Sequence, residues 1–120
     1  MRAHVTAELL KGIEPLFQRE FDPRITLGQL NRLHMATWGA KNHANFMNKG
    51  FMFDVNGHHL KGKVLITLAW DDTYNVTLIK EIRIDRKKAY EIGETFKNVY
   101  CDELSNLIDK KVEYIEDYTH

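Results

Sequence analysis

The sequence contains one cysteine, Cys101, and two prolines among its 120 residues. A single cysteine excludes a scaffold of intramolecular disulfides and the cysteine-rich zinc modules. No apolar run approaches the roughly 20 residues that a membrane-spanning helix needs. The 17 basic residues are balanced by 17 acidic ones, so the formal net charge is zero. Proteins that grip duplex nucleic acid with their whole surface carry an excess of lysine and arginine, so this balance argues against that class.

The composition is that of an ordinary globular chain. Hydrophobic residues make up 43% of the sequence and charged residues 28%, which excludes the disordered and fibrous classes. A chain of this length buries roughly two-thirds of the surface of its unfolded state, which is enough for one core. We therefore expect a single domain over residues 1–120. An N-terminal helical segment, residues 1–25, precedes a sheet and a C-terminal helix, residues 26–115.

Two segments carry the periodicity of amphipathic helices, one in residues 4–21 and one from residue 102 onward. The apolar positions are Val5, Leu9, Ile13, Leu16 and Phe17 in the first segment, and Leu104, Leu107, Ile108, Val112 and Ile115 in the second. Pro15 predicts either a kink in the first segment or the start of a second short helix.

The chain between these helices is less regular in places. Thr26 and Gln29 have the spacing of a capping box, which predicts a short helix that begins there. Residues 33–37 fit a first strand. Residues 40–50 are polar and rich in asparagine, which is typical of a loop or a single helical turn. Residues 89–100 fit neither the helical nor the strand period, so both assignments stay open.

Alternating apolar residues predict a series of antiparallel strands. Residues 51–55 alternate and end at Asn56-Gly57, a dipeptide that favours a two-residue hairpin turn with positive φ at both positions. Residues 64–70 are apolar at both alternating sets, which indicates a central strand covered on both faces. Residues 76–84 alternate as a half-buried strand. Together these elements predict an α+β fold: an antiparallel sheet of about four or five strands, packed on one side by the C-terminal helix and at least part of the N-terminal helical segment.

Residue types that often carry catalysis or metals are present without the spacing that such sites need. None of the six histidines forms a ligand pair three or four residues apart on a helix. His58 and His59 are adjacent and point to opposite faces of a strand, while His34 and His43 are the others worth a metal titration. Cys101 is followed by two acidic residues, whose charge opposes a thiolate. We therefore expect no catalytic residue, cofactor or metal, with an unrecognised small enzyme as an alternative.

A basic segment suggests a second alternative, a module that binds single-stranded nucleic acid. Its basic residues are Lys80, Arg83, Arg86, Lys87 and Lys88. Tyr74 and Tyr90 lie nearby in the sequence, and single strands are bound by basic grooves with stacking aromatic side chains. Glu81 and Asp85 interleave these charges, which favours a mixed, solvated strand face.

The order of several short motifs resembles a family of small uncharacterised proteins from phages, prophages and conjugative elements. The motifs are Gly-Ala-Lys-Asn at residues 39–42, a Phe-rich strand at residues 51–53, Ile-Thr-Leu at residues 66–68, Asp-Thr-Tyr-Asn-Val at residues 72–76, and Val-Tyr-Cys-Asp-Glu-Leu at residues 99–104. The resemblance covers about residues 26–112, and Trp38, Asn75 and Cys101 depart from the family pattern. It implies an accessory protein of phage or mobile-element origin in the bacterial cytoplasm. Such a protein is expected to bind a host or phage protein and to have no enzymatic activity or cofactor.

Five residues at the ends of the predicted elements are not explained by hydrophobic burial: Lys41, Asn42, Asp72, Tyr74 and Tyr100. Two interpretations are open. In the first, the residues fix the local backbone: Asn and Asp accept hydrogen bonds from turn amides, and a buried Tyr hydroxyl has a hydrogen-bond partner. Alternatively they converge as a partner-binding patch, because loops on a rigid sheet often carry binding residues and Tyr is favoured at interfaces.

Overall fold

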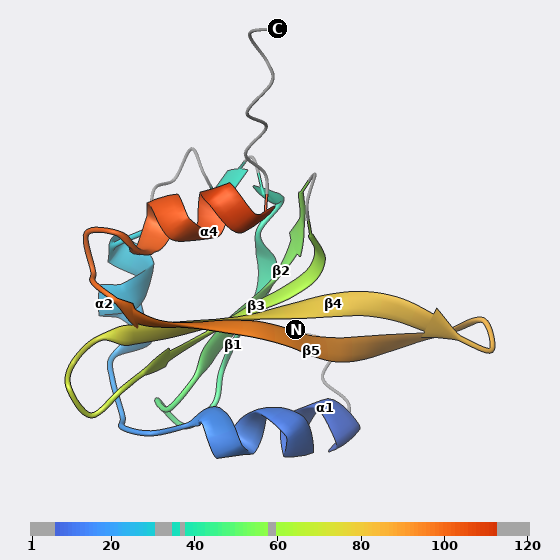
Figure 1. Ribbon diagram of the computed structural model, residues 1–120, viewed down its shortest axis with the longest axis horizontal. Helices are drawn as coiled ribbons and strands as arrows, with labels where there is room; N and C mark the ends of the chain where they lie inside the picture. The colour runs from blue at the N-terminus through green and yellow to red at the C-terminus, as the bar shows by residue number, and fades with distance from the viewer. Residues whose placement is uncertain (1–6, 31–34, 37, 58–59, 113–120) are drawn as a thin grey trace, which may run out of the picture.

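The computed structural model describes residues 7–30, 35–36, 38–57 and 60–112 of the chain. Five strands form one antiparallel sheet in which each strand pairs with the next along the chain. The strands are β1 (Lys41–Asn45), β2 (Phe51–Asn56), β3 (Lys61–Leu68), β4 (Tyr74–Ile84) and β5 (Lys87–Val99). This sheet and the helices that flank it confirm the predicted α+β fold (Figure 1).

The first and last helices lie on opposite faces of the sheet (Figure 1). The helical segments are α1 (Ala7–Ile13), the 3-10 turn η1 (Glu14–Leu16), α2 (Pro23–Gly28) and α4 (Leu104–Val112). We call the two sides of the sheet the α1 face and the α4 face. The buried residues of the α1 face are Leu9, Ile13, Met52, Leu65 and Ile79. Those of the α4 face include Phe53, Val64, Ile66, Leu104 and Ile108.

Strand β3 explains why both faces are covered. Successive side chains of a strand point to opposite faces, and the neighbours Leu65 and Ile66 are both fully buried. If a helix covered only one face of the sheet, the side chains of β3 that point to the other face would be exposed to water. The expectation that both helices share one side of the sheet is therefore wrong. The expectation of a central strand covered on both faces is confirmed for residues 64–68, but β3 ends at Leu68, and Trp70, which was expected in this strand, is 74% exposed.

Proline residues begin two of the helical segments. Pro15 stands in the first turn of η1, as expected, because it has no N–H to donate to the preceding turn. Helix α2 begins earlier than predicted: the Asp22 side chain caps it by accepting a 2.9 Å hydrogen bond from the N–H of Arg24, and Pro23 is its first residue. Thr26 is buried inside this helix. The capping-box prediction is wrong because a stronger start signal lies upstream.

The strand expected over residues 33–37 is wrong for the part that the structure describes. Residues 35–36 and Trp38 are helical, and the remaining residues of that strand lie outside the described ones. Tertiary contacts of Trp38 stabilise this conformation. Its ring stacks on Phe53 with 6.3 Å between centroids, and its Nε1 donates a 3.0 Å hydrogen bond to Oδ1 of Asp109.

The two edge strands were the hardest to recognise from the sequence. Strand β1 lies where a loop was expected, and none of its residues is fully buried, so it carries no apolar alternation. Strand β5 settles the open assignment of residues 89–100, which are extended up to Val99. Its register with β4 shifts twice, and Asn98 has a φ of 59°. Each bulge adds a residue to one strand, so the period of two is broken.

The pair of positive φ values expected at Asn56-Gly57 occurs at a different hairpin. Neither of these residues has a positive φ, so the prediction is wrong. Asp85 and Arg86, which join β4 to β5, have φ values of 51° and 68°. A two-residue type I′ turn requires positive φ at both central residues, and Asp tolerates this conformation better than most residues.

Glycine is required at position 57 because there is no room for a side chain, and not because of its φ. Its N–H donates a 2.9 Å hydrogen bond to the carbonyl oxygen of Leu60. His58 and His59 are outside the described residues. A Cβ atom at position 57 would lie 2.4 Å from the carbonyl oxygen of Val112. The close approach of α4 therefore excludes a larger residue.

Strands β4 and β5 continue past the end of β3 as a two-stranded ribbon (Figure 1). The pairing of β3 with β4 reaches Lys80, whereas the pairing of β4 with β5 reaches Ile84 and Lys87. We call residues 82–89 the arm. Within the described part of the chain, neither outer edge of the arm is paired with another strand.

The core assignment predicts the cost of truncating Ile66. The substitution Ile66→Ala is expected to lower the free energy of unfolding by about 2–5 kcal/mol, because it leaves a cavity in a fully buried site. Urea denaturation measures this change. Ile25→Ala is the matched control, since Ile25 is 61% exposed and its truncation should change stability by less than about 1 kcal/mol. Equal effects of the two variants would contradict the assignment of β3 as the core strand.

Candidate functional site

All five strands place polar side chains at one end of the α1 face, beyond the part of the sheet that α1 covers. They surround a cavity of about 330 Å³, which we call the polar pocket. Its polar lining residues include Lys41 and Asn42 from β1, Asp54 from β2, Lys61 from β3, Glu81 from β4, and Lys88 and Tyr90 from β5. Strand alternation puts Lys61, Lys63 and Leu65 on the same face, so the polar pocket adjoins the apolar cluster under α1.

A buried ion pair forms the floor of the polar pocket. The side chain of Lys63 is 0% exposed, and its Nζ donates a hydrogen bond to Oδ1 of Asp54. The same Nζ lies 4.8 Å from the centroid of the Tyr90 ring, a cation–π contact. The second carboxylate oxygen of Asp54 accepts a 2.8 Å hydrogen bond from Nδ2 of Asn42. Both oxygens of this carboxylate therefore have a partner.

The backbone of β1 aims Asn42 at that carboxylate. The register between β1 and β2 is irregular between Lys41 and Ala44, and Asn42 has a φ of 55°. Asn adopts this left-handed conformation more readily than most residues. An irregularity in an edge strand re-aims a side chain, and here it brings the Asn42 amide to Asp54.

The second carboxylate of the polar pocket is held more loosely. Glu81 lies 3.7 Å from Nζ of Lys61 and 3.7 Å from Nζ of Lys88, one lysine at each carboxylate oxygen. Both distances exceed those of charge-assisted hydrogen bonds. Burial raises the pKa of the Tyr90 hydroxyl, and Asp54 and Glu81 raise it further. Tyr90 therefore keeps its proton at neutral pH and remains a hydrogen-bond donor.

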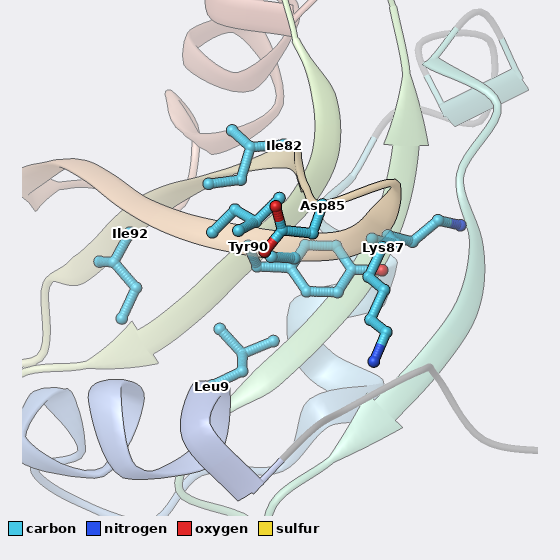
Figure 2. Close-up of a pocket in the computed structure, with 9 residues that line it drawn as sticks. Leu9, Ile82, Asp85, Lys87, Tyr90 and Ile92 are labelled. Carbon is cyan, nitrogen blue, oxygen red and sulfur yellow. The ribbon is translucent and has the colours of Figure 1, made fainter.

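A second cavity, of about 610 Å³, lies between α1 and the arm, and we call it the apolar groove (Figure 2). Its apolar lining comes from Leu9, Ile82, Ile84, Ala89 and Ile92, and its charged lining from Asp85, Lys87 and Lys88. Figure 2 shows Leu9 pointing from α1 toward the hairpin, with the Tyr90 ring beside it. Tyr90 and Lys88 line both cavities, so the polar pocket and the apolar groove adjoin at these two residues.

The five predicted site residues fall into two groups. Lys41 and Asn42 line the polar pocket, whereas the other three lie toward the opposite end of the sheet, where Leu68 pairs with Tyr74. Tyr74 is buried, and its hydroxyl shares a 3.0 Å hydrogen bond with Oγ1 of Thr26. This contact matches the structural interpretation of Tyr74.

Asp72 and Tyr100 are exposed, and each has a local role. Asp72, with a φ of 69°, lies in the turn before β4 and forms an ion pair with Arg19. Tyr100 precedes α4, and its N–H donates a 3.3 Å hydrogen bond to Oε1 of Glu103. The five residues therefore do not converge as one patch.

Lys63, Asp54, Glu81 and Tyr90 are the site residues that the sequence analysis did not identify as a site. A weak signal was present, since Lys63 interrupts an apolar strand and shares a face with Lys61. Their convergence depends on the pairing of four strands, which local spacing does not reveal. Tyr90 was considered only as a base-stacking residue.

Metal-ligating side chains do not gather in the part of the chain that the structure describes. No group of three or more His, Cys, Asp or Glu residues there could hold a metal ion. His43 instead stacks on Phe51 and Phe53, with centroid distances of 5.5 and 5.6 Å. Burial lowers the pKa of His43, against a smaller opposing effect of Asp54. Cys101 is an exposed free thiol, and His34 lies outside the described residues.

Comparison with known proteins finds no relative: no family model, no curated protein and no solved structure matches this chain. Among the described helices, none has the length and apolar character needed to cross a membrane.

The buried ion pair predicts unequal costs for removing its two members. Asp54→Ala leaves the Lys63 ammonium buried without its acid and should lower the free energy of unfolding by about 3–5 kcal/mol. Lys63→Met removes the charge and keeps most of the volume, so it should cost less, and the double variant should recover part of the loss. Urea denaturation of the three variants measures this. Equal losses for Asp54→Ala and the double variant would contradict the pairing.

Proposed function

We propose that this chain is a non-enzymatic binding protein of phage or mobile-element origin that acts on a host or phage protein in the bacterial cytoplasm. The observation that supports protein binding most is the apolar groove. Ile84 is 57% exposed at its edge. Charged residues of the arm border these apolar side chains. An apolar centre with a charged rim is the arrangement typical of protein interfaces.

The backbone of the arm supports the same proposal. Both outer edges of the arm are free of pairing with any other described strand. Unpaired N–H and C=O groups of an edge can pair with a strand of another protein. The side chains of the apolar groove would then select among partner segments. The order of the motifs from residue 39 to residue 104 supports the mobile-element origin.

The geometry of the polar pocket favours binding over catalysis. Both oxygens of Asp54 already accept hydrogen bonds, and Lys63 has no exposed surface. Neither group is therefore placed to exchange a proton with a ligand or to attack it.

Affinity capture with matched variants tests the proposed interface. Wild-type protein, Ile84→Glu and Ile25→Glu are tagged and incubated with host lysate, and captured proteins are identified by mass spectrometry. Ile84→Glu places a charge at the apolar groove and should reduce recovery of the partner at least tenfold. Ile25 is exposed to a similar degree, so Ile25→Glu is the control and should keep recovery. Melting temperatures verify that all three proteins are folded. Equal recovery by both variants, or no specific partner for the wild type, would contradict the proposal.

The charges of the arm favour nucleic acid as a second candidate partner. Arg83, Arg86 and Lys87 are exposed, and within the described residues no carboxylate forms an ion pair with them. Glu81 faces the polar pocket, where it lies 3.7 Å from Lys88 and is not paired with these three residues. Tyr74 is buried and offers no surface on which a base could stack. Any contact would therefore be made mainly with phosphates.

The salt dependence of oligonucleotide binding tests this second candidate. If the arm contacts phosphates of a single strand, Arg83→Gln/Arg86→Gln should reduce the slope of log K against log salt by about 1.4, since each phosphate contact contributes about 0.7. Lys97→Gln/Lys110→Gln removes two exposed charges elsewhere and should leave the slope unchanged. Fluorescence anisotropy at several salt concentrations measures both. Binding that does not depend on salt, or equal slopes for the two double variants, would exclude this candidate.

A further inference from the structure

We infer that the polar pocket binds an oxyanion, the carboxylate or phosphate group of a small ligand or of a partner's side chain, between Lys41, Lys61 and Lys88. This inference goes beyond the proposed function, because it assigns a ligand class to the polar pocket, which adjoins the apolar groove at Lys88 and Tyr90 but has its own lining of charged residues.

The first support is the local charge. Three ammonium groups, those of Lys41, Lys61 and Lys88, and two carboxylates, those of Asp54 and Glu81, line the polar pocket. Lys63 adds a fourth, fully buried ammonium group that pairs with Asp54, so the local charge is positive by two. The whole chain has a formal net charge of zero, so this end of the sheet face is positive against the average of the molecule. A partly enclosed cavity with an excess of one sign of charge attracts ions of the opposite sign.

The second support is the fixed floor of the polar pocket. Lys63 and Asn42 hold both oxygens of Asp54, so hydrogen bonds already stabilise the negative charge of this carboxylate. The ion pair is buried, and the Tyr90 ring contacts the Lys63 ammonium group, so both side chains are ordered before any ligand binds. A site that is already ordered loses less conformational entropy on binding.

The third support is the spare hydrogen-bonding capacity around the rim. Lys61 and Lys88 lie 3.7 Å from Glu81, too far for the hydrogen bond that a charged pair usually makes. The ammonium protons of both lysines are therefore open to a second acceptor. Tyr90 keeps its hydroxyl proton at neutral pH and adds a neutral donor. An oxyanion accepts from all of these groups, whereas a cation would meet three ammonium groups at the rim.

The size of the cavity limits the ligand. A volume of about 330 Å³ lies at the small end of the range for ligand pockets. It suits a single phosphate or a short dicarboxylate. The same chemistry is available from a free metabolite or from an acidic side chain of a bound protein, and the experiment separates these sources.

Titration of the full chain by NMR tests the inference with three probes: inorganic phosphate, succinate, and a capped Glu-Glu-Glu peptide, each at low ionic strength. We expect saturable shifts of the amide signals around the polar pocket for at least one probe. In Lys61→Gln/Lys88→Gln, which alters exposed or half-exposed side chains and should fold, the dissociation constant should rise at least tenfold. In the control Lys97→Gln/Lys110→Gln it should change less than twofold.

The outcomes are distinct. Binding of phosphate or succinate identifies a free ligand, whereas binding of the peptide alone identifies an acidic side chain of a partner. Absence of saturable binding for all three probes overturns the inference, as does an equal loss of affinity in the two double variants. Ile84→Glu separates this inference from the proposed function, because it should retain oxyanion binding even where it abolishes capture of a protein partner.

Discussion

The middle strand, β3, is buried on both faces from Gly62 to Thr67, and the positions of the other elements depend on this. Alternate side chains of β3 point to opposite faces, and each apolar face must be packed against another element. Helices α1 and α4 therefore lie on opposite sides of the sheet. Helix α4 covers the large apolar cluster on its face. Helix α1 has seven residues and covers only the part of the α1 face around Met52, Leu65 and Ile79. The rest of that face has to be closed by side chains of the sheet itself.

The pair of Lys63 and Asp54 is the consequence of this incomplete cover. Lys63 belongs to the same alternating set as Leu65, so it lies on the α1 face, where the Tyr90 ring from β5 lies 4.8 Å from its Nζ. A buried ammonium is tolerated only with a hydrogen-bonded acid, and the paired strand β2 supplies Asp54 directly opposite. The lysines, Glu81 and Tyr90 then surround this pair. The polar pocket thus lies at the border between the apolar cluster under α1 and the ion pair of Lys63 and Asp54.

The sequence predicted those elements whose own residues carry the stabilising interaction. The alternation along residues 51–55 and 64–70 and the stripe of α4 reflect direct burial of those side chains, and the corresponding elements are present. The edge strand β1 and the helical residues around Trp38 were missed because contacts with distant residues stabilise them. Asn56-Gly57 has the sequence of a type I′ turn, but the second residue is selected by the close approach of α4. The dipeptide therefore marks a position that needs glycine, but the reason is the space left by α4 and not a positive φ.

The candidate site was only partly predictable for the same reason. Lys41 and Asn42 were identified because they follow a glycine at the end of an apolar segment, a local property. Their partner Asp54 lies on β2 and was not connected with them, since spacing along the chain says nothing about strand pairing. Tyr74 and Tyr90 look alike in the sequence, yet the structure buries the first against Thr26 and leaves the second at the border of two cavities. Burial, rather than residue type, separates a structural tyrosine from a candidate binding residue.

The arm and the polar pocket differ in how much of the stability of the fold they carry. Ile84 is exposed at the tip of a ribbon that pairs with nothing beyond its own hairpin, so a substitution there removes few core contacts and leaves the sheet intact. Asp54 and Lys63 lie inside the sheet, where the loss of one partner destabilises the whole fold. A loss of binding in an arm variant therefore reports directly on function. In the polar pocket the rim lysines Lys41, Lys61 and Lys88 have this property, because they are exposed to water and their removal leaves the buried pair in place.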